Sequence, residues 1–557
     1  MARTIAIGVQ NFETLLRDGC FYIDKTEFIK EWWESRDQVT LITRPRRFGK
    51  TLNMSMVECF FSIKYQSQRD VFSDLNIWKE ENYRNMQGTY PVLFLSFAGV
   101  KDQNCSDAIE NIKANLVAIY NQNRFLVDEN FLNPAEKEQF ESVTMNMSDV
   151  TAAKSLQFLC GYLNKYYHKK VIILMDEYDT PLQEAYVNGY WKELVSFIRN
   201  LFNNTFKTNS FLERAIMTGV TRVSKESMFS DLNNLNVVTV TSKEYAACFG
   251  FTEVEVFSAM DEYGLTNKEE VKHWYDGFSF GDLKDIYNPW SIINFLDKKE
   301  LKPYWANTSS NSLAGSLIQT GNRNIKMKFE DLLQQRTISS VIDDEMIFNQ
   351  LDDSDENAVW SLLFASGYLK AVTVHGETYE LKLTNYEVRK MFETMVRGWF
   401  GKNSADYNDF IKALLRADVE EMNSYMERVA ESMFSSFDGG KTPSAKTTPE
   451  RFYHGFVLGL LVDLRGRYEV LSNRESGFGR YDVMLSPLHK TDDAIILEFK
   501  VFNPKKEKTL EETAQNALQQ IADKQYEQTL LDQGIDKASI RKYGFAFCGK
   551  EVLIKDA

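Results

Sequence analysis

The sequence has no cysteine pattern of the kind that marks a zinc cluster or a disulfide framework. Its six cysteines are scattered along the chain and form no C-x-x-C pair: Cys20, Cys59, Cys105, Cys160, Cys248 and Cys548. We therefore expect free, buried thiols at these positions.

Long apolar runs and an excess of positive charge are also missing. The longest strongly apolar runs, such as GFVLGLLV at 455–462, are much shorter than the roughly 20 residues of a membrane helix. The N-terminal stretch MARTIAIGVQNFETLL has one early arginine and no sustained apolar segment, which argues against a secretory signal. These absences predict a cytoplasmic protein without a membrane partner. A formal net charge of −14 disfavours non-specific nucleic-acid binding, so any such contact must rely on local basic patches.

The chain does have the composition of an ordinary globular protein. Of its 557 residues, 43% are hydrophobic and 26% are charged. A chain of this length is too long for one hydrophobic core, and we expect about two to four domains.

The segment TRPRRFGKT at 43–51 ends like a phosphate-binding loop. It follows a β-branched run at 39–43, typical of a buried parallel strand, and it leads into a stretch with helical apolar spacing. Gly49 gives the backbone room beside a phosphate, Lys50 can reach the β- and γ-phosphates, and the Thr51 hydroxyl can join a Mg²⁺ shell. Strand, loop and helix in this order favour a nucleotide site over a chance G-K-T match.

The start of the loop departs from the GxxxxGK[ST] pattern. Arg44 stands where the pattern has a glycine, although Pro45 can pre-set one backbone angle there. We therefore expect the loop still to bind phosphate. Arg46 and Arg47 have three open roles, which are contacts with phosphate, with DNA or with a neighbouring subunit.

A second, acidic element supports the nucleotide site. The segment KKVIILMDEYDTPL at 169–182 is an apolar strand that ends in Asp176 and Glu177. In P-loop enzymes the first acid orients Mg²⁺ and its water, and the second can polarise the attacking water. The alternative is an ordinary strand end followed by an acidic turn.

Two more strands, at 90–97 and 214–220, complete the expected doubly wound α/β sheet. Thr218 lies where a sensor residue contacts the γ-phosphate or the attacking water, and Arg222 can supply positive charge as an arginine finger does. Both placements rest on position along the sheet, so a structural role is equally compatible with the pattern.

Six motifs, in order, resemble those of the AAA-ATPase-like family of bacterial proteins: YIDKTEFI (22–29), RPRRFGKTLNMSM (44–56), LMDEYDTPL (174–182), TGVTRVSKESMFSDLNNL (218–235), WYDGFSFG (274–281) and YNPWSI (287–292). In that family the RPRRFGKT form of the loop is the usual one. The resemblance implies a P-loop AAA-type ATPase domain that uses ATP and Mg²⁺. The residues then expected to bind the nucleotide are Arg46, Arg47, Phe48, Gly49, Lys50, Thr51, Asp176 and Thr218. Thr51 and Asp176 would hold the metal, and Glu177 and Arg222 would be catalytic.

We place the ATPase core at residues 1–245 and a mostly helical lid at 246–330. The region 331–436 contains the order helix, two short strands, helix, which is compatible with a winged-helix module that contacts DNA. A packing or dimerisation domain is the alternative, and the few basic residues of the hairpin favour it. The segment FDGGKTPSAKTT at 437–448 is the expected linker.

The C-terminal segment, residues 449–557, begins with a helix and continues as a strand meander. Alternation places Glu498 and Lys500 on one face of their strand with Phe499 on the other, and Asp482 lies on one face of the strand before. If these strands are neighbours, the three polar side chains converge. Two carboxylates can hold Mg²⁺ or Mn²⁺, and the lysine can position or polarise a water, which suits phosphodiester hydrolysis.

The spacing D-x(15)-E-x-K resembles the core of the PD-(D/E)XK nuclease superfamily, and ESGFGRYDVML with IILEFK is similar to the branch that accompanies this ATPase family. The resemblance implies a restriction-endonuclease-like αβ domain, with Gln519 and Gln520 where related nucleases often carry a helix-borne polar residue. A further catalytic acid is left open. Glu450 is the first candidate, although Thr448-Pro449-Glu450 is also an ordinary helix start, and Glu475 is the second.

These features together predict an ATP-binding and ATP-hydrolysing protein fused to a Mg²⁺- or Mn²⁺-dependent nuclease-like domain that acts on DNA, with nucleotide state gating access to the DNA. The alternative is a nucleotide-dependent switch or scaffold in which one or both sites bind without turnover, which the acidic net charge favours. The expected partners are a nucleotide and DNA, and assembly into a homo-oligomer is left open.

Overall fold

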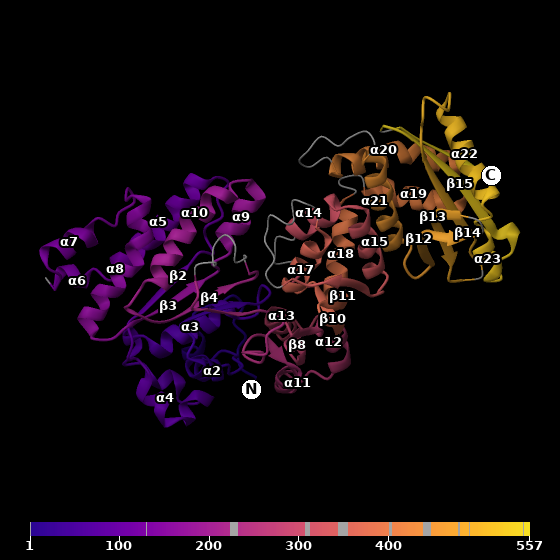
Figure 1. Cartoon of the computed structure of the whole chain (residues 1–557). Helices are drawn as coiled ribbons and strands as arrows, with labels where there is room; N and C mark the ends of the chain where they lie inside the picture. Colours follow the sequence, from indigo (N-terminus) through magenta and orange to yellow (C-terminus); the bar gives the residue numbers. More distant parts are fainter. Residues whose placement is uncertain are drawn as a thin grey trace. The chain divides into compact units, whose positions relative to one another are not determined.

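The computed structural model of the chain describes residues 2–557 with the exception of 130, 223–231, 307–311, 344–354, 400–403, 438–446, 477–478, 490 and 550 (Figure 1). The chain divides into two compact units. The first contains Met1–Ser310 and Ser339–Val388, and the second contains Asn311–Ile338 and Arg389–Ala557.

A five-stranded parallel sheet forms the centre of the first unit, with the strand order β2-β3-β4-β1-β5. Its strands are β1 (Val39–Thr43), β2 (Val92–Ser96), β3 (Val171–Asp176), β4 (Leu212–Gly219) and β5 (Leu235–Val238). Every residue of β1 and β3 is buried, as expected for a parallel sheet covered on both faces. This confirms the predicted α/β class of the N-terminal region.

The same region contains ten described α-helices, some of which cover the two faces of the sheet. They are α1 (Phe12–Arg17), α2 (Glu27–Ser35), α3 (Lys50–Phe61), α4 (Glu81–Met86), α5 (Cys105–Gln122), α6 (Phe125–Asp128), α7 (Pro134–Glu141), α8 (Asp149–Tyr167), α9 (Thr180–Asn188) and α10 (Trp191–Phe202). Figure 1 shows α5, α8 and α10 on one side of the sheet and α2 and α3 on the other. Helix α8 shows why these segments are helical, since Ser148 caps its first turn and Leu156, Leu159 and Leu163 recur at helical spacing and are buried.

The region predicted as a mostly helical lid contains a small sheet as well. Its elements are β6 (Phe251–Thr252), α11 (Glu253–Glu262), α12 (Lys268–Tyr275), β7 (Phe278–Phe280), β8 (Leu283–Tyr287) and α13 (Pro289–Lys298). The three strands pair antiparallel in the order β6-β8-β7. They are two, three and five residues long, which is too short for an alternating pattern to be recognised in the sequence.

The expected order of helix, hairpin and helix is present in the middle region. It consists of α17 (Glu356–Ala365), β10 (Leu369–His375), β11 (Thr378–Leu383) and α18 (Tyr386–Gly398). Strand β9 (Ile338–Val341) adds a third strand beside β11. This arrangement is compatible with a winged helix and with a packing domain.

The second unit is built on a mixed sheet with the order β12-β13-β14-β15-β16, in which only β14 and β15 run parallel among the described pairs. Its strands are β12 (Tyr468–Ser476), β13 (Gly479–Pro487), β14 (Ala494–Val501), β15 (Ile540–Cys548) and β16 (Glu551–Asp556). Its helices are α14 (Ser312–Thr320), α15 (Arg323–Leu333), α19 (Ser404–Arg416), α20 (Val419–Phe437), α21 (Thr447–Asp463), α22 (Leu510–Asp523) and α23 (Gln528–Asp532). Met484 and Ile496 of the sheet share a buried core with Leu518 and Ile521 of α22.

The features that the sequence lacks can be compared with the structure. All six cysteines are free, but only Cys59, Cys160 and Cys248 are buried, and Cys548 is exposed. Within the described ranges, no helix combines the length and the apolar character needed to cross a membrane. Most of the predicted linker, 438–446, lies outside the described residues.

Candidate functional sites

Three neighbouring strands bring the predicted nucleotide-site residues to one edge of the parallel sheet. The order β3-β4-β1 places the loop after β1 near the ends of β4 and β3, because the carboxyl ends of parallel strands meet at the same edge. Asp176, the last residue of β3, accepts a 2.7 Å hydrogen bond from the Thr51 hydroxyl and a second bond from the Thr218 hydroxyl. The structure thus joins the loop, Asp176 and Thr218 directly.

The Asp176 carboxylate is the centre of this arrangement. It is 1% exposed, and burial raises its pKa, while the hydrogen bonds from Thr218 and Thr51 act in the opposite direction. Thr218 therefore holds the carboxylate that faces Thr51. This contact with Asp176 is a role that position along the sheet did not reveal.

Gly49, Lys50 and Thr51 form the phosphate end of the loop. Gly49 precedes α3 with a φ of 80°, a left-handed conformation that glycine adopts without strain, and no side chain caps the helix. The first N–H groups of α3 therefore receive no cap from residue 49, as in helix starts that bind phosphate. The Lys50 ammonium donates to the carbonyls of Arg44 and Pro45, both at 2.9 Å, and burial lowers the Lys50 pKa.

Glu177, the first residue after β3, has an unusual backbone conformation. Its φ is 52°, which for a non-glycine residue costs about 1–3 kcal/mol. The side chain is half-buried, lines a cavity and accepts a 3.1 Å hydrogen bond from the Thr180 hydroxyl. The Glu177 carboxylate thus lies at the cavity, and its catalytic role stays a prediction.

Asp179 ties the turn after β3 to the segment after β4. It is 2% exposed and accepts hydrogen bonds of 2.9 Å from the backbone N–H groups of Val220 and Thr221. Gly219 allows this approach, since an added Cβ there would lie 2.7 Å from Asp179 Oδ1. Arg222 follows and is half-buried, and residues 223–231 of the same motif lie outside the described part of the chain. Asp179 is a positioning residue that the sequence pattern did not single out.

A cavity of about 490 Å³ opens beside these residues. This volume is typical of small-molecule sites, which span about 300–1,000 Å³. Its lining includes the loop residues 46–51 and Glu177, and it also includes apolar side chains: Ile7, Val9, Phe21, Ile23, Phe251 and Ile293. The lining therefore combines charged and apolar side chains.

Arg44, at the position of the missing glycine, is a buried structural residue. Its side chain is 0% exposed, and its guanidinium donates to the carbonyls of Thr239 at 2.6 Å and Glu244 at 3.1 Å. It also lies 4.5 Å from the centre of the Phe280 ring. Burial lowers the Arg44 pKa to about 9. Arg44 therefore attaches the loop to segments that lie about 200 residues away in sequence.

Arg46 and Arg47 differ from Arg44, since both are exposed and line the cavity. Arg46 donates to the Gln183 side chain at 3.1 Å, and the Arg47 guanidinium lies 4.3 Å from the centre of the Trp290 ring. This position is compatible with a phosphate contact, and the three roles that the sequence left open stay predictions.

Residues of the region 246–330, the expected lid, contact the same loop. Phe48 is buried, and its ring lies 4.8 Å from that of Phe278 and 5.4 Å from that of Phe280. Asn288 caps α13 and also donates to the Arg46 carbonyl at 3.2 Å, which the Trp305 indole reaches at 3.0 Å. The motifs WYDGFSFG and YNPWSI thus support the loop from the lid.

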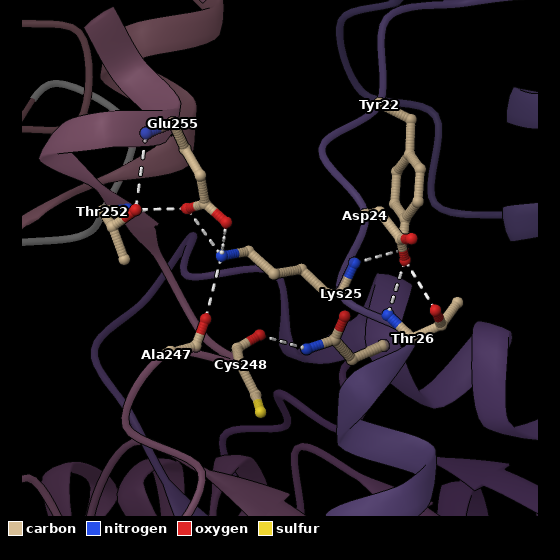
Figure 2. A network of polar contacts seen from close by, with 9 residues as sticks. Tyr22, Asp24, Lys25, Thr26, Ala247, Cys248, Thr252 and Glu255 are labelled. Atoms are coloured by element: carbon tan, nitrogen blue, oxygen red, sulfur yellow. Dashed lines mark hydrogen bonds and ion pairs between the residues drawn. The ribbon is translucent and has the colours of Figure 1, made fainter. Parts of the chain in front are cut away.

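The YIDKTEFI motif connects the core to the lid through Lys25 (Figure 2). Its ammonium is buried and donates to both carboxylate oxygens of Glu255 at 2.7 Å and to the Ala247 carbonyl at 2.8 Å. Glu255 in turn completes a capping box with Thr252 at the start of α11. Asn53 of α3 donates to the neighbouring Cys248 carbonyl at 2.9 Å, so two core elements hold the segment that forms one wall of the cavity.

Replacing Lys25 by methionine is expected to destabilise the protein by about 2–4 kcal/mol, because it leaves the partly buried Glu255 carboxylate without its cation. Thermal or urea unfolding measures the change. Lys30→Met is the matched control, since Lys30 pairs with the exposed Glu80, and it should have a clearly smaller effect. Equal effects of the two substitutions would contradict the role given to Lys25.

Glu387, at the start of α18, is a buried carboxylate next to residues that contact the phosphate-binding loop. It accepts hydrogen bonds from Ser291 Oγ at 2.8 Å and from the Trp305 backbone N–H at 2.6 Å, and burial raises its pKa from 4.5 to about 7. The folded protein therefore keeps this proton after the unfolded chain has lost it. As the pH rises from about 4.5 to about 7, the free energy of unfolding of the wild type is expected to fall by roughly 3 kcal/mol relative to that of Glu387→Gln. Unfolding of both proteins at several pH values tests this, and parallel pH profiles would contradict it.

In the second unit, β13 and β14 are antiparallel neighbours, as the predicted nuclease site requires. The register pairs Val483 with Leu497, which places Asp482 opposite Glu498 at the end of the ladder. Asp482 Oδ2 accepts a 2.8 Å hydrogen bond from the Phe499 backbone N–H. Glu498 is 3% exposed, and burial together with the Asp482 charge raises its pKa to about 9. The two carboxylates are therefore adjacent.

Gln520 of α22 links Glu498 to Lys500. Its amide nitrogen donates to Glu498 Oε1, and its amide oxygen accepts a 2.8 Å hydrogen bond from the Lys500 ammonium. The same nitrogen lies 3.1 Å from the hydroxyl of the buried Tyr526. Asp482, Glu498, Lys500 and Gln520 thus form one connected site.

The remaining predicted residues of this unit lie elsewhere. Gln519 is exposed and donates to Asp523, so of the two glutamines only Gln520 reaches the site. Glu450 lies in the first turn of α21 and Glu475 in β12, but their side chains are outside the described part of the structure. The choice between these two acids therefore stays open.

Comparison with known proteins gives a family match for each of the two regions that contain these candidate sites. Residues 6–229 match the AAA-ATPase-like family model, described as a predicted AAA-ATPase, and residues 448–557 match the PD-(D/E)XK nuclease superfamily. The chain joins an AAA-ATPase-like domain to a PD-(D/E)XK nuclease superfamily domain. It is also 26% identical over 398 residues to an uncharacterized protein in the vnfD 5′ region of Azotobacter chroococcum mcd 1, a match that covers 70% of this chain and 68% of that protein. These matches confirm the two resemblances drawn from the sequence.

Proposed function

We propose that the AAA-ATPase-like domain binds ATP with Mg²⁺ in the cavity and hydrolyses it. The observation that carries this proposal is the direct contact of Asp176 with Thr51 and Thr218, next to a cavity of about 490 Å³ that Lys50 and Thr51 line. Lys50 and the exposed Arg46 and Arg47 would hold the phosphates. Glu177 would orient and deprotonate the attacking water, and Arg222 would supply charge to the transition state.

The residues present fit a divalent metal at the nucleotide. The Thr51 hydroxyl and the buried Asp176 carboxylate are hard oxygen donors that face each other at 2.7 Å. The metal would neutralise charge on the β- and γ-phosphates. Thr218 would keep the Asp176 carboxylate aimed at Thr51, and Asp179 would fix the segment that leads to Arg222.

We further propose that the PD-(D/E)XK domain hydrolyses DNA phosphodiesters. Asp482 and Glu498 would hold Mg²⁺ or Mn²⁺, since Glu498 Oε2 is buried and has no hydrogen-bond partner within the described residues. No group of three His, Cys, Asp or Glu side chains suited to a metal occurs in the described ranges, so a further ligand must come from Glu450, Glu475, water or the substrate. The metal would polarise the phosphate, and Lys500, held by Gln520, would position the water.

Glu177→Gln tests the ATPase proposal. This substitution is expected to lower phosphate release by at least about 100-fold and to leave ATP binding intact, because it removes only the base. Phosphate release and equilibrium binding of a fluorescent ATP analogue give the two readouts. Lys50→Ala should remove binding, and Glu193→Gln, an exposed acid on α10, should change neither. Binding that depends on Lys50 without any phosphate release from wild type would support the switch or scaffold instead.

A further inference from the structure

A loop with three exposed lysines follows directly after the strand that carries Glu498 and Lys500. This lysine loop, residues 503–508, has the sequence NPKKEK. Lys505, Lys506 and Lys508 are exposed, and no side chain of the described residues pairs with their ammonium groups. In a chain with a net charge of −14, the loop is a local basic patch of the kind that nucleic-acid binding requires.

The acids beside the lysine loop accept hydrogen bonds from backbone and amide groups, and among the described residues they form no ion pair with its lysine side chains. Glu507 accepts a 3.0 Å hydrogen bond from the Asn503 backbone N–H and a 2.8 Å bond from the Asn516 amide of α22. Glu512 accepts a 2.7 Å bond from the Lys508 backbone N–H. The acidic groups thus fix the backbone of the loop, and the ammonium groups remain available to solvent or to a ligand.

One face of α22 connects the lysine loop to the candidate nuclease site. Asn516 donates to Glu507, and Gln520, four residues later, donates to Glu498. Four residues of α-helix rise about 6 Å, whereas a DNA strand advances about 3.4 Å per nucleotide. Asn516 and Gln520 are thus about 6 Å apart along the helix axis, a separation comparable to about two nucleotide steps.

We propose that the lysine loop binds the phosphate backbone of the nucleic acid on which the Asp482 and Glu498 site acts. The inference rests on the proposed nuclease function and assigns the substrate contact to a particular surface. Each ammonium neutralises a phosphate and releases a counterion, which gives affinity that depends on salt and carries no sequence information.

The test is the salt dependence of DNA binding by the full chain in a chelator, where cleavage is suppressed. A short fluorescein-labelled duplex is titrated at several salt concentrations between about 50 and 200 mM. The test variant carries glutamine at Lys505, Lys506 and Lys508. The control variant removes the same charge at three exposed lysines elsewhere: Lys207, Lys299 and Lys537. Lys537 precedes β15, whose start is paired with the start of β14, so it lies at the end of that strand pair away from Lys500.

The loop variant is expected to bind DNA more weakly than wild type. The magnitude of its slope of log affinity against log salt concentration should be smaller by about 2 to 3, because each lost phosphate contact lowers it by about 0.9. The control variant should retain the wild-type slope. Equal slopes for wild type and the loop variant would overturn the role of the loop while leaving the nuclease proposal intact. A wild-type chain that binds no DNA would overturn both.

Discussion

Replacing Glu498 by glutamine is expected to abolish cleavage and at the same time to make the protein more stable. The substitution removes a carboxylate charge that would hold the metal at the proposed nuclease site, so activity should fall by at least about 1,000-fold. The same charge is unfavourable in the fold, because Glu498 is buried, lies beside Asp482 and has a pKa raised to about 9. Glutamine keeps the oxygen that accepts from Gln520 and needs no proton to be neutral.

The gain in stability from Glu498→Gln should be about 1–3 kcal/mol when it is measured in a chelator. Cleavage of plasmid DNA with Mn²⁺ and urea unfolding in EDTA provide the two measurements. Glu551→Gln is the control, because Glu551 is exposed at the start of β16. This substitution should change neither the cleavage of DNA nor the stability in EDTA. A variant that keeps cleaving, or that is less stable than wild type in EDTA, would argue against the site described for Glu498.

Replacing Arg44 by glycine restores the usual phosphate-loop pattern and is nevertheless expected to damage the protein. The substitution removes a fully buried side chain, leaves the carbonyls of Thr239 and Glu244 without their donor and opens a cavity next to Phe280. A loss of about 3–5 kcal/mol is typical of such a change. Thermal unfolding should show a clearly lower midpoint, and ATP affinity should fall because the loop loses its attachment.

Arg47→Gly is the matched control for Arg44→Gly, because it makes the same change three residues later. Arg47 is exposed and has a φ of 66°, where glycine is favoured, so its replacement should be neutral or slightly stabilising. The changes that the two substitutions cause in the free energy of unfolding are therefore expected to differ in sign or by several kcal/mol. Similar losses at both positions would contradict the distinction between a structural Arg44 and an exposed Arg47.

The regular elements that position both sites could be predicted from the sequence because their signals are local. The apolar runs of β1 and β3 and the helical spacing of α3 fall where the strands and the helix are found. The alternation in β14 correctly separated Phe499 from Glu498 and Lys500, and Phe499 packs on Phe545 on the other face. Only the assumption that β13 and β14 are adjacent strands of the sheet could not be derived from these local patterns.

Contacts between distant parts of the sequence could not be predicted in this way. The partners of Arg44 lie about 200 residues away, so the loop sequence gave no sign that this arginine is buried. Asp179 looked like part of an acidic turn, because its role depends on two N–H groups after β4. Gln519 and Gln520 are adjacent in sequence, and only the position of α22 against β14 decides that Gln520 reaches Lys500.

The central claim is that one chain carries two separate hydrolytic sites. The most direct measurement compares wild type with Asp482→Asn. One preparation of each protein is assayed for phosphate release from ATP and for cleavage of DNA, both in the presence of Mg²⁺ or Mn²⁺. The account predicts that wild type performs both reactions and that Asp482→Asn releases phosphate at the wild-type rate but cleaves no DNA. Cleavage that persists in Asp482→Asn, or a wild-type protein that performs neither reaction, would contradict it.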